Sequence, residues 1–268
     1  MNKKISIIAS LLLSASLLAA CGGKEDDKEK IIIGATPVPH AEILENIKDD
    51  LDELGYTLEI KIFNDYIIPN TALSDGQLDA NFFQHIPYLE SMNASDNLGI
   101  TWATKVHLEP LGLYSDKIKS LDELSEGATI TIPNDNTNGS RALKLLADNG
   151  LITLEDKELV SLLDIKSNKL NLKIEELDAP ALARTLQDVE ASVINTNYAL
   201  EADLNPTEDA IIIESSDSPY ANVLAVREDD RASEKTKALV KVLNSEKTKK
   251  FIEEEYKGSI LPAFEENK

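Results

Sequence analysis

The chain has 268 residues, of which 48 are acidic and 27 are basic, so its formal net charge is −21. This acidic balance argues against nucleic acid as a partner, because the phosphates would repel the chain. Hydrophobic residues make up 42% of the sequence, which predicts a packed globule, and the single cysteine excludes an internal disulfide or metal–thiolate cluster.

The first twenty residues have the pattern of a secretory signal. Lysines begin it, residues 5–18 are apolar, and small residues precede Cys21. The apolar stretch is shorter than the roughly 20 residues that span a bilayer. We expect cleavage before Cys21 and acylation of that cysteine, for example with palmitate, so that a lipid anchor holds the protein on the extracytoplasmic face of the cell membrane. The alternative is a chance cysteine at the end of a signal.

Residues 21–30 contain no apolar side chain after Cys21 and predict a solvated tether.

The next segment has the order strand, helix, strand. Residues 31–35 form a short apolar run, which predicts a strand. The following segment has apolar residues at helical spacing and ends at Gly55; these residues are Ile43, Leu44, Ile47, Leu51 and Leu54. Residues 57–63 then alternate between apolar and polar side chains, which predicts a second strand. This order predicts a parallel β-α-β unit.

The same order recurs later in the chain. Residues 129–132 and 191–194 have strand character, and each run leads through a polar loop into a helical stretch. The alternation predicts an α/β protein. We place crossings between two lobes at residues 111–114 and 223–226. The expected lobes are residues 31–113 plus 223–268, and residues 114–222, with a ligand cleft between them.

The asparagine-rich loop around residues 134–138 ends in a helix that Thr137 or Asn138 could cap. Arg141 would then lie in the first turn, where a cation opposes the helix dipole. Free N–H groups and a guanidinium fork together suit a carboxylate ligand. The alternative is that Arg141 pairs with one of the many acidic residues of the chain.

Aromatic side chains gather between residues 63 and 88, namely Phe63, Tyr66, Phe82, Phe83 and Tyr88. Neighbours on a strand face opposite ways, so one of Phe82 and Phe83 belongs to the core and the other can line a pocket. Such a wall suits a side chain like a thioether. His85 ends this run before a proline that suits a helix start, and we expect it to form hydrogen bonds.

Asn195 ends the apolar strand of residues 192–194, and Asn222 follows residues 218–220 at the second candidate crossing. Both positions are at the ends of predicted strands, where open α/β sheets bind ligands. Asn195 and Asn222 could each donate to and accept from a polar head group, although such residues are commonly turn formers. The remaining histidines, His40 and His107, have no metal-ligand spacing. We therefore expect no metal and no cofactor. Nucleophile-elbow and Walker motifs are also absent from the sequence, so we expect no enzyme.

Five stretches resemble the NlpA family of lipoproteins, which bind methionine for ABC importers. They are FNDYIIPN at 63–70, DANFFQHIPYL at 79–89, IPND at 132–135, VINT at 193–196 and SPYAN at 218–222. The resemblance covers nearly the whole mature chain. It implies a two-lobed, periplasmic-binding-protein-like fold of type II, with L-methionine or a methionine-containing dipeptide between the lobes.

The resemblance also implies roles for particular residues. Arg141 would hold the ligand carboxylate beside Asn138, and Asn195 and Asn222 would hold the amino-acid head group. The ligand side chain would be surrounded by Tyr66, Phe83, His85 and Tyr88. The implied partners are an ABC permease with its ATPase, and we expect the binding protein to be a monomer.

Two other classes of function stay open at this point. A surface adhesin or sensor lipoprotein could use the same fold to bind a protein, and would expose a substantial apolar patch. A lipoprotein hydrolase could use His85 with a nearby carboxylate, although no nucleophile motif supports it. The sequence does not rank L-methionine, D-methionine and a dipeptide, because one methylene changes binding by only about 1–3 kcal/mol.

Overall fold

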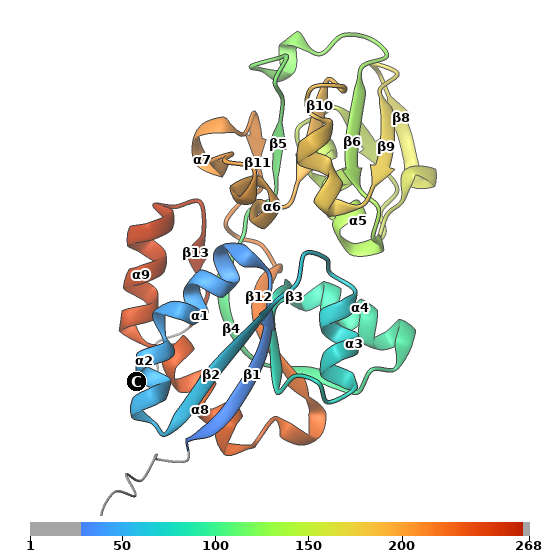
Figure 1. Cartoon of the computed structure of the whole chain (residues 1–268). Helices are drawn as coiled ribbons and strands as arrows, with labels where there is room; N and C mark the ends of the chain where they lie inside the picture. The colour runs from blue at the N-terminus through green and yellow to red at the C-terminus, as the bar shows by residue number, and fades with distance from the viewer. Residues whose placement is uncertain (1–27, 265–268) are drawn as a thin grey trace, which may run out of the picture.

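The computed structural model describes residues 28–264, which form two lobes, each built on its own sheet (Figure 1). Helices cover both sheets, which confirms the predicted α/β class. The expected signal, Cys21 and most of the expected tether lie outside the described residues. Within residues 28–264, every helix is too short or too polar to cross a bilayer.

The first lobe contains a six-stranded mixed sheet in the order β13-β4-β12-β3-β1-β2. Strand β1 pairs in parallel with β2 and β3, whereas β12 runs antiparallel to both β3 and β4. The strands are β1 (Glu29–Ala35), β2 (Tyr56–Ile62), β3 (Ala80–His85), β4 (Ile100–Leu108), β12 (Ala221–Arg227) and β13 (Leu261–Pro262). The parallel β1 and β2 confirm the predicted β-α-β start.

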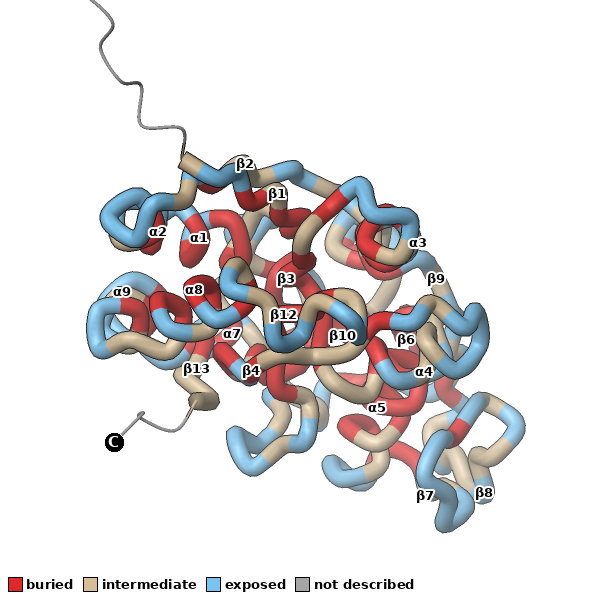
Figure 2. Tube along the Cα trace, turned by 90° about the horizontal axis from the view of Figure 1, so that it is seen from below, coloured by how far each residue is buried: buried red, intermediate tan, exposed pale blue. Residues whose placement is uncertain are grey.

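Helices pack on both faces of this sheet and enclose two apolar clusters. One face carries the turn η1 (Pro37–Ala41), α1 (Glu42–Asn46), α2 (Lys48–Glu53), α8 (Glu234–Leu243) and α9 (Glu246–Tyr256). The other face carries α3 (Ile68–Ser74) and α4 (Ile86–Asp96). Figure 2 shows that the buried positions follow the inward faces of these elements.

Two expectations for the first lobe are corrected by the structure. The helix predicted through residues 43–54 is broken at Ile47, whose φ and ψ are −94° and 0°, and Leu54 is 38% exposed. The apolar face nevertheless continues across the break, because Ile47 and Leu51 are fully buried. Strand β1 also begins inside the expected tether of residues 21–30, because Glu29 already pairs with Tyr56 of β2.

The second lobe contains a five-stranded sheet in the order β11-β5-β10-β6-β9. Its strands are β5 (Gly112–Tyr114), β6 (Thr129–Pro133), β9 (Lys173–Leu177), β10 (Ala191–Ile194) and β11 (Ile212–Ile213). A separate hairpin is formed by β7 (Ile152–Leu154) and β8 (Ile165–Asn168). The helices are α5 (Asn136–Asp148), α6 (Thr196–Glu201) and α7 (Pro206–Asp209), with short turns η2 (Leu121–Glu123), η3 (Leu162–Asp164) and η4 (Ala179–Thr185).

The chain passes between the two sheets twice, through residues 109–111 after β4 and residues 214–220 before β12. The predicted crossings were residues 111–114 and 223–226. The first connection overlaps the first of these ranges, and the second connection ends shortly before the second range. The lobe limits at residues 113 and 223 stay a prediction. Because both connections reach the sheets where the lobes meet, residues of β3, α5 and β10 are brought to one place (Figure 1).

Candidate functional site

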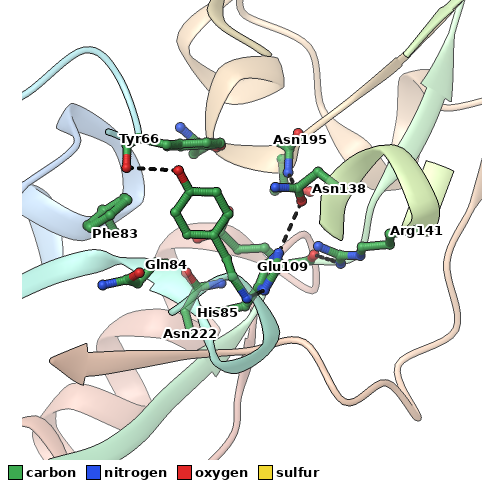
Figure 3. Close-up of a pocket in the computed structure, with 12 residues that line it drawn as sticks. Tyr66, Phe83, Gln84, His85, Glu109, Asn138, Arg141, Asn195 and Asn222 are labelled. Atoms are coloured by element: carbon green, nitrogen blue, oxygen red, sulfur yellow. Dashed lines mark hydrogen bonds between the residues drawn. The ribbon is translucent and has the colours of Figure 1, made fainter. Parts of the chain in front are cut away.

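A small cavity of about 20 Å³ lies where the lobes meet. Side chains from both lobes converge on it (Figure 3). The lining consists of Tyr66, Phe83, Gln84, His85, Tyr88, Glu109, Asn138, Arg141, Asn195, Thr196, Asn197 and Asn222.

All eight residues that the sequence selected for ligand binding line this cavity. Four further lining residues were missed, and these are Gln84, Glu109, Thr196 and Asn197. Glu109 had one usable signal, because it follows His107 by two residues and such pairs share a face of a strand. Gln84 had none, since strand alternation places it opposite Phe83.

Aromatic rings form the apolar wall. The centroid of the Tyr66 ring lies 5.9 Å from that of Phe83, 5.8 Å from that of Tyr88 and 5.1 Å from that of Tyr198. The Tyr88 hydroxyl donates to the backbone oxygen of Tyr66 over 3.0 Å. Phe82 faces the core and is fully buried. The expected division between Phe82 and Phe83 is therefore confirmed.

Buried amides hold the strand beneath this wall. Gln84 donates to Asn70 and Asn81 over 2.6 and 2.9 Å, and Asn81 also donates to the backbone oxygen of Pro69. Each amide is at most 3% exposed. Because buried amides are costly to leave unpaired, this cluster fixes the segment that carries Tyr66 against β3.

Helix α5 begins earlier than the sequence predicted. Its N-cap is Asp135, whose carboxylate accepts the backbone N–H groups of Thr137 and Asn138, so neither of those residues is the cap. A carboxylate is a stronger acceptor for these N–H groups than a neutral side chain. Arg141 therefore lies in the second turn, and the unfavourable first-turn placement that we expected does not occur.

The Arg141 guanidinium is held on two sides. Its Nε donates to Glu214 over 2.9 Å, and its Nη2 donates to the other oxygen of Glu214 and to the backbone oxygen of Glu109. The guanidinium also lies 4.3 Å above the ring of Tyr220. Pairing with an acidic residue, one of the two alternatives from the sequence, thus takes place. These bonds use Nε and Nη2, and none of them uses Nη1.

His85 joins the lobes as a neutral donor. Its Nδ1 accepts the backbone N–H of Tyr88, so the proton lies on Nε2, which is 3.1 Å from Oδ1 of Asn138. Burial, and then the nearby charge of Arg141, lower the pKa of His85 to about 3. The expectation that His85 forms hydrogen bonds is confirmed.

Asn138 and Asn195 face each other across the polar end of the cavity. The Asn195 amide donates to Oδ1 of Asn138 over 2.8 Å, while the Asn138 amide donates to Asp135. Asn195 is 6% exposed, and its own Oδ1 has no hydrogen-bond partner among residues 28–264. The pocket therefore presents a buried acceptor that is free to receive a donor.

His40, His107 and Glu109 are brought together by the fold, although the sequence spacing gave no sign of it. Their ligand atoms lie within 4.8 Å of one another, which is compatible with a metal. However, Nδ1 of His107 has no partner in the described part of the chain. A metal on Nε2 would leave that Nδ1–H buried without an acceptor, whereas metal-binding histidines usually donate their second N–H. The cluster therefore fits a metal poorly.

Known proteins resemble this chain in sequence. The family model of the NlpA lipoproteins matches residues 31–264. The methionine-binding lipoprotein MetQ of Bacillus subtilis (strain 168) is 45% identical over 273 residues, which cover 98% of this chain and 100% of the relative. The D-methionine-binding lipoprotein MetQ of Salmonella typhi is 40% identical, and the match covers 93% of this chain and 94% of the relative.

Solved structures share the fold. A nutrient binding protein from Burkholderia cenocepacia bound to methionine has a TM-score of 0.85 and 44% identity, over 87% of this chain and 100% of its own. An ABC transporter periplasmic substrate-binding protein from Coxiella burnetii has a TM-score of 0.84 and 41% identity, with coverage of 87% and 100%. These matches confirm the two-lobed binding-protein fold that the sequence resemblance implied.

Proposed function

Because this chain belongs to the NlpA lipoprotein family, we propose that it captures methionine or a methionine-containing dipeptide and delivers it to an ABC importer. A lipid on Cys21 holds it at the extracytoplasmic face of the membrane. The loaded protein, a monomer, docks on a permease that a separate ATPase drives. It breaks no bond in its ligand.

One observation carries this proposal. A single small cavity combines an aromatic wall of Tyr66, Phe83 and Tyr88 with a polar end at Arg141 and Asn195. A thioether makes favourable contacts with aromatic rings, each of about 0.3–1.5 kcal/mol. The guanidinium suits a carboxylate. An amino acid with an unbranched thioether side chain matches both ends.

The lining residues take the following roles in this proposal. Arg141 holds the ligand carboxylate through Nη1, the group that its bonds to Glu214 and Glu109 do not use. Asn195 and Asn222 hold the head group. Asn138 accepts hydrogen bonds from His85 and Asn195 and thereby keeps the polar end in place. The ligand side chain lies among Tyr66, Phe83, His85 and Tyr88.

The hydrolase alternative finds little support in the site. Both ring nitrogens of His85 are occupied, one as acceptor and one as donor, so the ring has no free lone pair to act as a base. The hydroxyl of Thr196, a cavity-lining residue, donates to the backbone oxygen of Pro110 over 2.5 Å. Neither group is arranged as an activated nucleophile.

Calorimetric titration of the ligand-stripped protein with L-methionine, D-methionine, Gly-Met and glutamine tests the proposal. We expect tight binding of at least one methionine compound and weak binding of glutamine, whose polar side chain loses its hydration against the aromatic wall. A folded sample that binds none of the methionine compounds would overturn the proposal and favour an adhesin or sensor.

The same titration of Arg141→Ala tests the carboxylate role. We expect affinity to fall roughly 100-fold or more, because a buried carboxylate loses its charged partner. Lys144→Ala is the matched control, since this cation on the same helix bonds the backbone oxygen of Glu158 outside the cavity. Unchanged affinity in folded Arg141→Ala would contradict the assignment.

A further inference from the structure

A charged group that the proposed roles leave unused lies at the base of the cavity. Glu109 follows β4, is 6% exposed and lines the cavity. Its Oε1 is 2.7 Å from Nε2 of His107 and 3.2 Å from Nε2 of His40. The two histidines come from β4 and from η1 and are at most 1% exposed.

Both histidines act as neutral donors to this carboxylate. Nδ1 of His40 lies 2.7 Å from the hydroxyl of Thr36, which can donate to it. Its Nε2 faces two acceptors, Oδ1 of Asn222 and Oε1 of Glu109, so the proton lies on Nε2. Burial lowers the pKa of His40 to about 4 and that of His107 to about 3. The imidazoles therefore orient the carboxylate without cancelling its charge.

The nearby charge of Arg141 favours the ionised form of Glu109, but the two side chains form no ion pair among residues 28–264. The Arg141 guanidinium is matched by the carboxylate of Glu214, and it reaches Glu109 only at the backbone oxygen. A buried carboxylate without a cationic partner is costly. His40 and His107 lie at Oε1, and the backbone N–H of Asn197 is a further donor to the carboxylate. Acceptor capacity still remains, because a carboxylate can accept about four hydrogen bonds.

A second acceptor lines the same cavity, Oδ1 of Asn195, which has no hydrogen-bond partner among residues 28–264. The cavity thus offers a carboxylate and an amide oxygen to a ligand, in addition to the Arg141 end. An ammonium group has three N–H donors and a positive charge, so its chemistry suits both an amide oxygen and a carboxylate. A hydroxyl has one donor and no charge, and an acylated amine has lost its charge.

We propose that Glu109, oriented by His40 and His107, receives the ligand's α-ammonium group and thereby restricts the site to ligands with a free amino group. This inference rests on the proposed function and deepens it. Glu109 is then the specificity-determining residue of the polar end, and the two histidines are positioning residues.

The test compares L-methionine with its 2-hydroxy analogue, which keeps the thioether and the carboxylate but has a hydroxyl in place of the ammonium. In the wild-type protein we expect methionine to bind at least about 100-fold more tightly. This comparison needs no variant. Equal affinity of the wild-type protein for the two ligands would overturn the inference even if every variant failed to fold.

The variant Glu109→Gln locates the selectivity. We expect it to lose affinity for methionine by about 100-fold while its affinity for the analogue changes less than about threefold, so that the preference disappears. Glu214→Gln is the matched control, because this carboxylate holds Arg141 and its change should weaken both ligands by a similar factor. A folded Glu109→Gln protein that keeps the wild-type preference would overturn the inference.

His107→Phe tests the positioning role by the same comparison, the ratio of the affinity for methionine to the affinity for its 2-hydroxy analogue. Removal of the N–H donor should reduce the preference for methionine, while His107→Gln, which keeps a donor, should restore part of it. An unchanged ratio in both variants would overturn the role of His107.

Two further outcomes separate the proposals. A wild-type protein that binds neither ligand overturns the proposed function together with this inference, whereas methionine binding with an unchanged ratio in Glu109→Gln overturns only the inference. Binding that is lost after chelation and returns with added Zn²⁺ would show that the cluster holds a metal, which would also overturn it.

Discussion

All three histidines of the chain lie buried around the cavity. Burial is the largest cause that lowers the pKa of His40 to about 4 and the pKa values of His85 and His107 to about 3. In the unfolded chain each would titrate near 6.5. The folded state therefore stays neutral at these positions where the unfolded state takes up protons.

Stability of the ligand-free protein should therefore fall as pH is lowered from about 6.5 toward 4. Because the unfolded state binds more protons in this window, each histidine should cost about 1.4 kcal/mol of unfolding free energy at pH 5.5. Glu109 opposes this trend, since burial raises its pKa and the folded state then binds a proton above the usual range. Urea denaturation at pH 7.5, 6.5 and 5.5 measures the net slope.

The variant His85→Asn provides the control for that slope. Its amide can still donate to Asn138, and one titrating group is removed, so the pH dependence should be shallower by one histidine's share. Identical slopes for this variant and the wild-type protein would contradict the assignment of His85 as a buried neutral donor.

At the scale of elements, the start of α5 serves both stability and the site. Asp135 accepts the backbone N–H groups of Thr137 and Asn138 and also the Asn138 side-chain amide. Gly139 allows the helix to approach β6, because a Cβ there would lie 2.9 Å from the backbone oxygen of Pro133. The cap thus sets the orientation of Asn138 toward His85.

Asp135→Ala should lower the unfolding free energy by about 0.5–2 kcal/mol, the usual loss for an N-cap, and should also weaken methionine binding. Ser245→Ala is the matched control, because Ser245 caps α9 through Thr248 far from the cavity and should affect stability alone. Urea denaturation and calorimetry give the two quantities. Equal affinity losses in the two variants would contradict the link between the cap and the site.

At the scale of the whole molecule, polar contacts join the lobes across the cavity. The Tyr66 hydroxyl donates to Oδ1 of Asn197 over 2.6 Å, and that of Tyr198 donates to the backbone oxygen of Asn64 over 3.4 Å. His85 and Asn138 form a third link. A ligand favours this closed arrangement only by as much as it binds the closed form better than the open one.

Tyr66→Phe should open part of the population and reduce apparent methionine affinity about threefold to tenfold, since one hydrogen bond contributes about 0.5–1.5 kcal/mol. Tyr198→Phe, which removes the longer bond, should change affinity less. Small-angle scattering should show a larger radius of gyration for ligand-free Tyr66→Phe than for the ligand-free wild-type protein, and therefore a larger compaction when methionine is added. An equal effect of the two substitutions would contradict the ranking.

Much of the site could be predicted from sequence because its residues stand at the ends of recognisable strands. Phe83 and His85 close β3, Asn195 follows β10, and Asn222 lies at the start of β12. The α/β class followed from periodicities that depend only on local geometry. Local patterns indicate which residues stand at the ends of strands, and open α/β sheets bind ligands in the crevice outside the carboxyl ends of their strands.

Only the tertiary structure decided the electrostatics of the site. Arg141 meets Glu214 across 73 positions of sequence, and His40 meets Asn222 across 182. With so many carboxylates in the chain, no sequence pattern singles out the two that are paired with Arg141 or with the buried histidines. Periodicity determines which face of an element is buried, but burial next to a specific charge depends on contacts between segments far apart in the sequence, and these contacts set the protonation states.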